Sequence, residues 1–277
     1  MAIAKKTNLL LLALLLLYGA DSFAATTTYD AASAAYERGD YAEGMKLFRQ
    51  LAAQGHQWAQ RRLGLIYAEG KGVPRDYQEA IKWFRLAAAQ GNIQSQYSLG
   101  FAYENGHGVP QDLQEALKWY RIAAGREDEW AQTRLGSIYA EGKGVPQDYQ
   151  EAAKWFRLAA AQGYPPAQFS LGLAYENGQG VARDFQEAVK WYRLAAMQGH
   201  QWAQINLGVM YASGTGVQQD FVRADMWFTL AAALSGEGSA TATKNRDRIA
   251  AKMTPEQIAT AQEMIRRCQE SQFNNCE

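Results

Sequence analysis

The sequence predicts an all-α solenoid, that is, an array of helical hairpins stacked side by side. Three observations lead to this fold class. The same residues recur with a period of 36 along most of the chain. Each period contains two amphipathic helical patterns separated by glycines, and no segment shows the strict alternation of a strand. One hairpin of this size has too little apolar surface to be stable alone, so neighbours are expected to share a core.

The first 24 residues are expected to be a secretory signal peptide and no part of the fold. Lys5 and Lys6 precede the apolar run 9–17, and small residues lead to Ala24, where we expect cleavage. The run is shorter than the ~20 apolar residues that a membrane span needs. We therefore expect a periplasmic or secreted protein without a membrane span after signal removal.

Residues 25–54 are predicted to form an N-terminal capping helix pair. Tyr36, Asp40, Tyr41 and Phe48 repeat the order of Tyr, Asp, Tyr and Phe in the later units, but the connection between the two helices is shorter. A cap of this kind covers the open core at the end of a solenoid.

Five 36-residue units follow over residues 55–235. Each first helix carries an apolar stripe such as Ala59, Leu63 and Tyr67, at helical spacing, and a Gly-x-Gly-Val turn ends it. Each second helix follows an aspartate that we expect to be its N-cap. In four units a glutamate three residues later is expected to complete a capping box. The aspartates are Asp76, Asp112, Asp148, Asp184 and Asp220.

Two further positions recur inside the helices. A glycine lies within each first helix, as at Gly64, where it costs about 1 kcal/mol relative to alanine. Such a repeated cost is consistent with the backbones of adjacent helices touching at the glycine. A tryptophan followed by Phe or Tyr lies in each second helix and is predicted to be part of the core. These tryptophans are Trp83, Trp119, Trp155, Trp191 and Trp227.

This pattern resembles the Sel1-like repeat family, a relative of the tetratricopeptide repeats. The family's signature of Leu-Gly-x-x-Tyr, Gly-x-Gly-Val, Asp, Trp-Phe/Tyr and Ala-Ala is met in all five units. The resemblance implies a right-handed superhelix of antiparallel helix pairs, in which the first helices line a concave surface. It also implies a role in holding protein complexes together, often in bacterial envelopes or at host surfaces.

Residues 236–277 are predicted to be C-terminal capping helices and a tail. Thr254 and Gln257 flank Pro255 in the pattern of a capping box with proline at the first helical position. The two cysteines of the chain, Cys268 and Cys276, are close in sequence. In an oxidising compartment such a pair is expected to form a disulfide, unless the segment between them frays.

The chain shows no pattern expected of an enzyme, a metal site or a nucleic-acid binder. Its 28 Lys and Arg balance 28 Asp and Glu, and no basic block is present to neutralise phosphates. The histidines His56, His107 and His200 lie in separate units, and no nucleophile motif is found. The Gly-x-Gly turns lack the other parts of a phosphate-binding loop. We therefore expect no catalysis, no cofactor and no metal.

A second set of tryptophans indicates a binding surface. Trp58, Trp130 and Trp202 are 72 residues apart, and packing of the repeat does not require them. Other apolar and polar residues follow on the same face of the first helices. The candidate partner-binding residues are Trp58, Arg61, Leu65, Tyr97, Phe101, Trp130, Arg134, Phe169, Leu173, Trp202, Ile205 and Val209.

Apolar anchors with a polar rim are what a peptide groove needs. The sequence therefore predicts a non-catalytic interaction scaffold or adaptor of the bacterial cell envelope that binds a partner polypeptide on its concave face. Three alternatives stay open. The aromatic residues can stack on an envelope glycan such as peptidoglycan, a secreted protein can contact a host protein, or these residues can merely pack between neighbouring first helices.

Overall fold

A computed structural model of the chain describes residues 28–273 and 276, so the expected signal peptide lies outside the described residues. Over this described part the chain is helical and contains no strand, which confirms the predicted all-α class. The chain divides between Arg126 and Glu127 into two compact units, each of which is described by itself.

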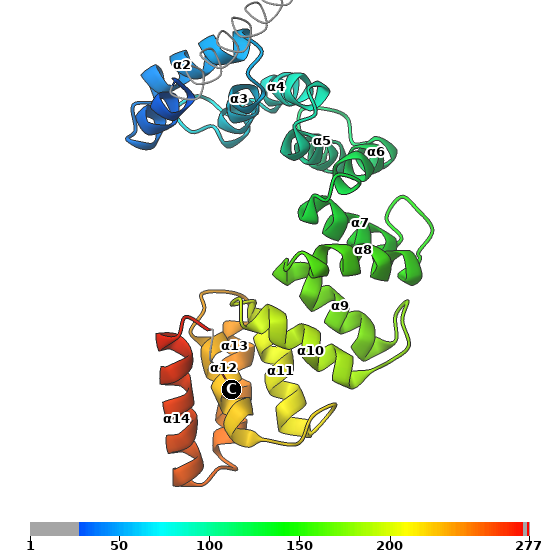
Figure 1. The fold of residues 1–277 in the computed structure, drawn as a ribbon, viewed down its shortest axis with the longest axis vertical. Coiled ribbons are helices and arrows are strands. Elements are labelled where there is room, and N and C mark those ends of the chain that lie inside the picture. Colours follow the sequence, from blue (N-terminus) through cyan, green and yellow to red (C-terminus); the bar gives the residue numbers. More distant parts are fainter. Residues whose placement is uncertain (1–27, 274–275, 277) are drawn as a thin grey trace, which may run out of the picture. The chain divides into compact units, whose positions relative to one another are not determined.

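Unit 1 is a series of antiparallel helical hairpins in which each helix packs on the next (Figure 1). It begins with a helix over residues 28–37. Its further helices are α2 (Tyr41–Ala53), α3 (Gln57–Glu69), α4 (Tyr77–Ala89), α5 (Ile93–Asn105) and α6 (Leu113–Ala124). The N-terminal pair, predicted as a cap, packs on α3 through α2.

Unit 2 continues the same arrangement with three hairpins and two additional helices. Its helices are α7 (Glu129–Glu141), α8 (Tyr149–Ala161), α9 (Pro165–Asn177), α10 (Phe185–Ala196), α11 (Gln201–Ser213), α12 (Phe221–Ala232), α13 (Ser239–Ala250) and α14 (Pro255–Glu270). Both α13 and α14 pack on α12. They close the core around Trp227 and Phe228, which are buried.

The predicted aspartate caps are present at the start of the second helices. The Asp76 carboxylate accepts a hydrogen bond of 3.0 Å from the Glu79 backbone N–H, and the four equivalent aspartates cap their helices in the same way. The glutamate does not complete the expected capping box, because Glu79 forms a 2.7 Å ion pair with Lys82 instead. A full capping box is formed at Thr254 and Gln257, as predicted.

The glycine within each first helix is explained by an aromatic ring and not by touching backbones, so that expectation was wrong. A Cβ built on Gly64 would lie 2.5 Å from Cε1 of Phe84 on the second helix of the same hairpin. The same contact recurs in four further pairs. They are Gly100 with Tyr120, Gly136 with Phe156, Gly172 with Tyr192, and Gly208 with Phe228. Each glycine therefore admits a buried ring close to the helix backbone.

The tryptophans of the second helices are only partly core. Trp227 is fully buried beneath the C-terminal helices. Trp83 and its other equivalents are half-buried, and Trp83 packs against the core formed by the N-terminal helix pair and α3. The core prediction is therefore confirmed for Trp227 and only partly for the others.

Buried glutamines, which the sequence analysis missed, join consecutive hairpins. Gln60 is 4% exposed, and its side-chain amide donates to the Ala52 carbonyl over 3.1 Å. Its Oε1 accepts a hydrogen bond of 2.7 Å from the Gln90 amide at the end of the second helix of its own hairpin, so Gln60 links that helix end to the preceding hairpin. The pairs Gln132–Gln162 and Gln168–Gln198 repeat this contact in unit 2. The Ala-Gln or Ser-Gln pair that recurs in each first helix was the available signal.

The tail of the chain is fixed to α14 by a disulfide. Cys268 and Cys276 are bonded in the structure, with 4.3 Å between their Cα atoms, and both side chains are buried. The bond closes a short loop, so it restrains the tail and the end of α14 and no distant part of the chain.

Candidate interaction surface

One side of each first helix is left free by the core, and we call this side the first-helix face. On α3, Ala59, Leu63 and Ile66 point into the core and are buried. Trp58, Arg61 and Leu65 follow one another at the same helical spacing on another side of the helix, because residues three or four apart share a face. The equivalent residues of α5, α7, α9 and α11 define this face in the other hairpins.

The three tryptophans predicted to bind a partner reach the solvent. Trp58 is 46%, Trp130 53% and Trp202 39% exposed. Two other predicted residues, Phe101 and Val209, are also exposed. The Trp130 ring lies 5.2 Å from the Tyr164 ring by centroid distance, so its exposed aromatic surface is extended by a neighbour. These residues are therefore accessible to a partner.

Six other members of the predicted set are half-buried. They are Arg61, Leu65, Tyr97, Arg134, Phe169 and Leu173. The Phe169 ring stacks on the His200 ring at a centroid distance of 4.7 Å. Leu173 packs against the core of unit 2. Each of these residues contributes only part of its surface to the first-helix face.

Ile205 does not belong to an accessible surface. Its side chain is 3% exposed, because the chain after α12 folds over this part of α11. The Gln201 side chain holds that segment in place. Its amide group donates a hydrogen bond of 2.9 Å to the Ala231 carbonyl, and its Oε1 accepts a hydrogen bond of 3.2 Å from the Gly238 N–H. The C-terminal cap thus occupies the position where a partner was expected to contact Ile205.

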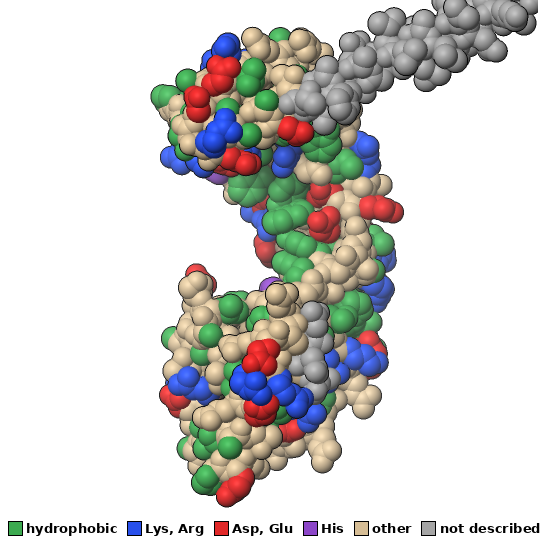
Figure 2. Space-filling model, turned by 60° about the vertical axis from the view of Figure 1, so that its left-hand side comes forward, with side chains coloured by type: hydrophobic (Ala, Val, Ile, Leu, Met, Phe, Trp, Pro, Cys, Tyr) green, Lys and Arg blue, Asp and Glu red, His purple; other side chains and the backbone are tan. Residues whose placement is uncertain are grey.

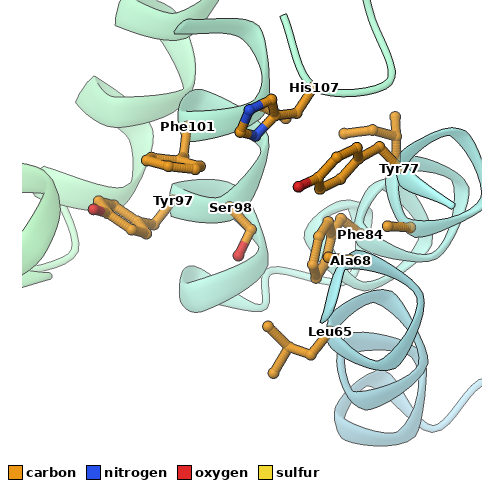
Figure 3. Close-up of a pocket in the computed structure, with 11 residues that line it drawn as sticks. Leu65, Ala68, Tyr77, Phe84, Tyr97, Ser98, Phe101 and His107 are labelled. Atoms are coloured by element: carbon orange, nitrogen blue, oxygen red, sulfur yellow. The ribbon is translucent and has the colours of Figure 1, made fainter. Parts of the chain in front are cut away.

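An apolar pocket of about 200 Å³ opens among α3, α4 and α5 of unit 1 (Figure 3). Three of the predicted residues, Leu65, Tyr97 and Phe101, line it together with Tyr77, Phe84 and His107. Figure 3 shows Tyr97 and Phe101 on one helix and Leu65 across the opening. The pocket brings together side chains from three helices.

Sequence reasoning missed His107 and Tyr77 as members of this site. The His107 ring stacks on the Tyr77 ring at a centroid distance of 4.6 Å and lies 5.7 Å from Phe101. His107 occupies the variable position of a Gly-x-Gly turn, where two other units have Lys71 and Lys143. An aromatic side chain at a position that is otherwise charged or polar was the available signal.

Two arginines of unit 1 lie on α3 without an ion pair to a carboxylate of the described chain. Their Nε atoms, in Arg61 and Arg62, are buried and have no hydrogen-bond partner among the described residues. The Arg62 guanidinium lies over the Tyr36 ring, 5.1 Å from its centroid. Burial, and secondarily the charge of Arg62, lowers the pKa of Arg61, but an arginine remains charged at neutral pH.

A second set of exposed apolar residues, also missed by the sequence analysis, lies on the second helices. It consists of Leu86, Ile122, Leu158 and Leu194, each close to half exposed. The equivalent Leu230 is 3% exposed, because α12 is covered by the C-terminal helices. This set is separate from the first-helix face and provides matched control positions for it.

The remaining surface of the described residues is of mixed composition. On the visible face in Figure 2, acidic and basic side chains are interspersed and hydrophobic ones reach the surface between them. Among the described residues, no three or more His, Cys, Asp or Glu side chains are grouped so that they can hold a metal ion. None of the described helices combines the length and the apolar character required to span a bilayer.

Comparison with known proteins finds one family and several solved structures. The Sel1 repeat family matches residues 30–56, 59–92, 93–128, 131–164, 165–200 and 203–236. The first match falls on the N-terminal helix pair, so this pair, predicted as a cap, is a further, shorter repeat. No curated protein sequence matches the chain significantly.

Three solved structures illustrate the similarity. A Sel1 repeat protein from Oxalobacter formigenes is 34% identical, with 87% of this chain and 99% of that chain covered and a TM-score of 0.75. A protective antigen of uropathogenic Escherichia coli is 26% identical, with 91% and 78% covered and a TM-score of 0.44. An immunity protein from Pseudomonas aeruginosa is 21% identical, with 81% of each chain covered and a TM-score of 0.46.

Proposed function

Because the chain belongs to the Sel1 repeat family, whose members are generally protein-interaction scaffolds, we propose that it is a non-catalytic adaptor of the bacterial cell envelope. In this proposal the first-helix face of each unit binds a partner polypeptide. The observation that carries the proposal is the solvent exposure of Trp58, Trp130 and Trp202. Tryptophan is among the residues that contribute most to protein interfaces, and its exposure in water is unfavourable until a partner covers it.

The surroundings of these tryptophans support a protein partner. Arg61 follows Trp58 by three residues and Arg134 follows Trp130 by four, and residues at these spacings are neighbours on a helix surface, so both of these exposed rings have a cationic neighbour. Tryptophan, tyrosine and arginine together are the composition enriched in protein interfaces. Exposed apolar residues with no ordered role in the core are otherwise unfavourable for a monomer.

The test compares two triple variants of the full chain. The first changes Trp58, Trp130 and Trp202 to alanine, and the control changes Leu86, Leu158 and Leu194, which are similarly exposed on the second helices. Crosslinking in the producing bacterium followed by mass spectrometry identifies the partner, and capture of that purified partner is then measured. We expect the tryptophan variant to lose at least about tenfold in affinity and the control to retain it. Equal affinities of the two variants would contradict the proposal.

The same variants distinguish a glycan from a protein. If purified peptidoglycan binds the wild-type chain and the tryptophan variant fails to bind it, the surface recognises glycan and the protein-partner proposal is wrong. Retention of every captured protein by the tryptophan variant would also contradict the protein-partner proposal, without assigning the surface to glycan.

The location in the envelope has its own measurement. We expect the intact mass of the chain recovered from the periplasm or the medium to correspond to cleavage after Ala24. Reduction of the same sample is expected to add the mass of hydrogens on Cys268 and Cys276. A full-length chain in the cytosol would contradict the proposed location.

A further inference from the structure

The pocket of unit 1 and the arginines beside it narrow the chemistry of the partner segment. Resting on the proposed function, we propose that the first-helix face of unit 1 binds an acidic segment that carries one large apolar side chain. The apolar side chain enters the pocket between Leu65 and Phe101, and a neighbouring Asp or Glu of the segment pairs with Arg61.

The size and lining of the pocket fit a single side chain. Its volume of about 200 Å³ is below the ~300–1,000 Å³ typical of small-molecule sites. Apart from Ser98 and His107, its lining consists of apolar and aromatic residues. Phe101 at its edge is 45% exposed, so the opening faces solvent. A leucine, methionine or phenylalanine side chain matches these properties.

The cationic group lies one helical turn from the opening. Arg61 precedes Leu65 by four residues on α3, and residues at this spacing are neighbours on a helix surface. In the next repeat the residue equivalent to Arg61 is Tyr97, whose ring lies 5.6 Å from the Tyr120 ring. Tyr120 is equivalent to Phe84, which lines the pocket. By this equivalence Arg61 lies beside the pocket.

A carboxylate from a partner supplies what this arginine lacks. Neither Arg61 nor Arg62 forms an ion pair in the described part of the chain, and both side chains are only half-buried, so part of each remains accessible to a partner. A charge-assisted bond between a guanidinium group and a carboxylate is among the stronger hydrogen bonds. Two adjacent arginines also repel a basic segment. The charge of the face therefore selects an acidic segment over a basic one.

Unit 2 contains a copy of the same hairpins in which this combination is absent. Tyr77 and Phe84 are identical in the copy, where they are Tyr149 and Phe156. The residues that differ are Arg61, Leu65, Ile81, Tyr97, Phe101 and His107, and their counterparts 72 residues later are Thr133, Ser137, Ala153, Phe169, Leu173 and Gln179. The two rings are thus kept, whereas Ile81, the rim and the arginine at position 61 change; the counterpart of Arg62 is still an arginine, Arg134. The counterparts also provide substitutions that this repeat already tolerates.

The experiment uses short fluorescent peptides with blocked ends and the full chain. One peptide has a central phenylalanine flanked by glutamates, a second has lysines in place of the glutamates, and a third has alanine in place of the phenylalanine. Fluorescence anisotropy gives the affinity of each for the wild type, for Arg61→Thr and for Leu65→Ser with Phe101→Leu. Circular dichroism verifies that each variant is folded.

We expect the glutamate–phenylalanine peptide to bind at least about tenfold more tightly than either of the other two. Arg61→Thr should remove the preference for glutamate over lysine, and the pocket variant should remove the preference for phenylalanine over alanine. Binding should weaken as salt is added, because an ion pair at the surface is screened.

Other outcomes overturn the inference. Equal binding of the lysine peptide, no effect of Arg61→Thr, or no binding of the acidic peptide each does so. Self-association of the chain that Arg61→Thr abolishes would assign the face to a second copy instead. If the tryptophan variant loses its partner while Arg61→Thr retains it, the proposed function stands and this inference alone is wrong.

Discussion

A buried tyrosine–glutamate pair in unit 1 is the basis for a prediction about stability. The Tyr120 hydroxyl donates a hydrogen bond of 2.8 Å to the Glu104 carboxylate. Tyr120 is 0% and Glu104 1% exposed. In the preceding repeat the same two positions are occupied by Phe84 and Ala68. In the repeat that lacks the tyrosine hydroxyl, the glutamate is therefore absent as well.

Changing Tyr120 to phenylalanine is expected to destabilise unit 1 by about 2 kcal/mol. The ring is kept, so packing is unchanged, but the buried carboxylate loses a donor, and a buried group left short of a partner costs about 1–3 kcal/mol. Glu104→Ala alone removes the acceptor of a buried hydroxyl and has a similar cost. The double variant restores the combination of Ala68 and Phe84. Its destabilisation should therefore be about 2 kcal/mol less than the sum of the two single effects.

Local hydrogen exchange measures this coupling most directly. Solenoids unfold with limited cooperativity, so the exchange of amides in α5 and α6 reports the stability of the affected hairpin. Amides of α12, in unit 2, serve as an internal control. Additivity of Tyr120→Phe and Glu104→Ala within about 0.5 kcal/mol would refute the reasoning, because independent sites add to that accuracy.

Three further predictions concern the helices. Gly64→Ala should lower the melting temperature although alanine favours a helix by about 1 kcal/mol, because its Cβ would lie 2.5 Å from the Phe84 ring. Adding Phe84→Leu should recover part of that loss, and a Gly64→Ala variant as stable as the wild type would contradict the contact. Glu127 has φ 66°, where the other junctions have glycine, so Glu127→Gly should stabilise the chain by about 1 kcal/mol in urea unfolding, and a loss would contradict this. His56 and His200 cap their helices through Nδ1, and burial lowers the pKa of both. As the pH decreases, these histidines take up protons more readily in the unfolded chain than in the folded chain, so the free energy of unfolding should fall below about pH 6.5. The fall should be smaller in a variant with asparagine at both positions. If urea unfolding gives the same pH dependence for the variant and the wild type, the prediction is wrong.

The features that repeat were predictable from the sequence. Helices, their caps and the glycine turns recur every 36 residues, so each pattern occurs several times along the chain with different residues around it. Asp76 and its equivalents precede an apolar stripe in each unit, and a side-chain cap is a local interaction that depends on few residues. The exposure of Trp58 followed from the same periodicity, because the helical spacing places it away from Leu63.

The features that join distant segments were not predictable. Ile205 has the periodicity of a surface residue, but the chain around Gly238 covers it. The ring of Phe84 over Gly64 depends on how closely two helices approach, and the sequence contains only the two residue types. The pocket requires side chains from α3, α4 and α5 at once, so Tyr77 could not be assigned to it from the pattern of one helix.

The 72-residue spacing of Trp58, Trp130 and Trp202 is not by itself evidence for binding, because the core alternates with the same period. The hydrogen-bonded pair of Glu104 and Tyr120 recurs 72 residues later as Glu176 and Tyr192, which are also joined by a hydrogen bond. Features of the core and the exposed tryptophans therefore share the 72-residue period of the two-hairpin segment.

Two other observations are stronger evidence for binding: the tryptophans are exposed, and the residues near them differ between the two copies. The tryptophans are common to both copies and remain exposed, so they can contribute affinity in either unit. Arg61, Leu65 and Phe101 change to Thr133, Ser137 and Leu173 on the same face, while the ring of Phe84 beneath them is kept as Phe156. Substitutions on a free face, beside rings that are the same in both copies, alter recognition without altering the fold. Selectivity between partners should therefore depend on these residues, and the shared tryptophans should determine how tightly any partner binds.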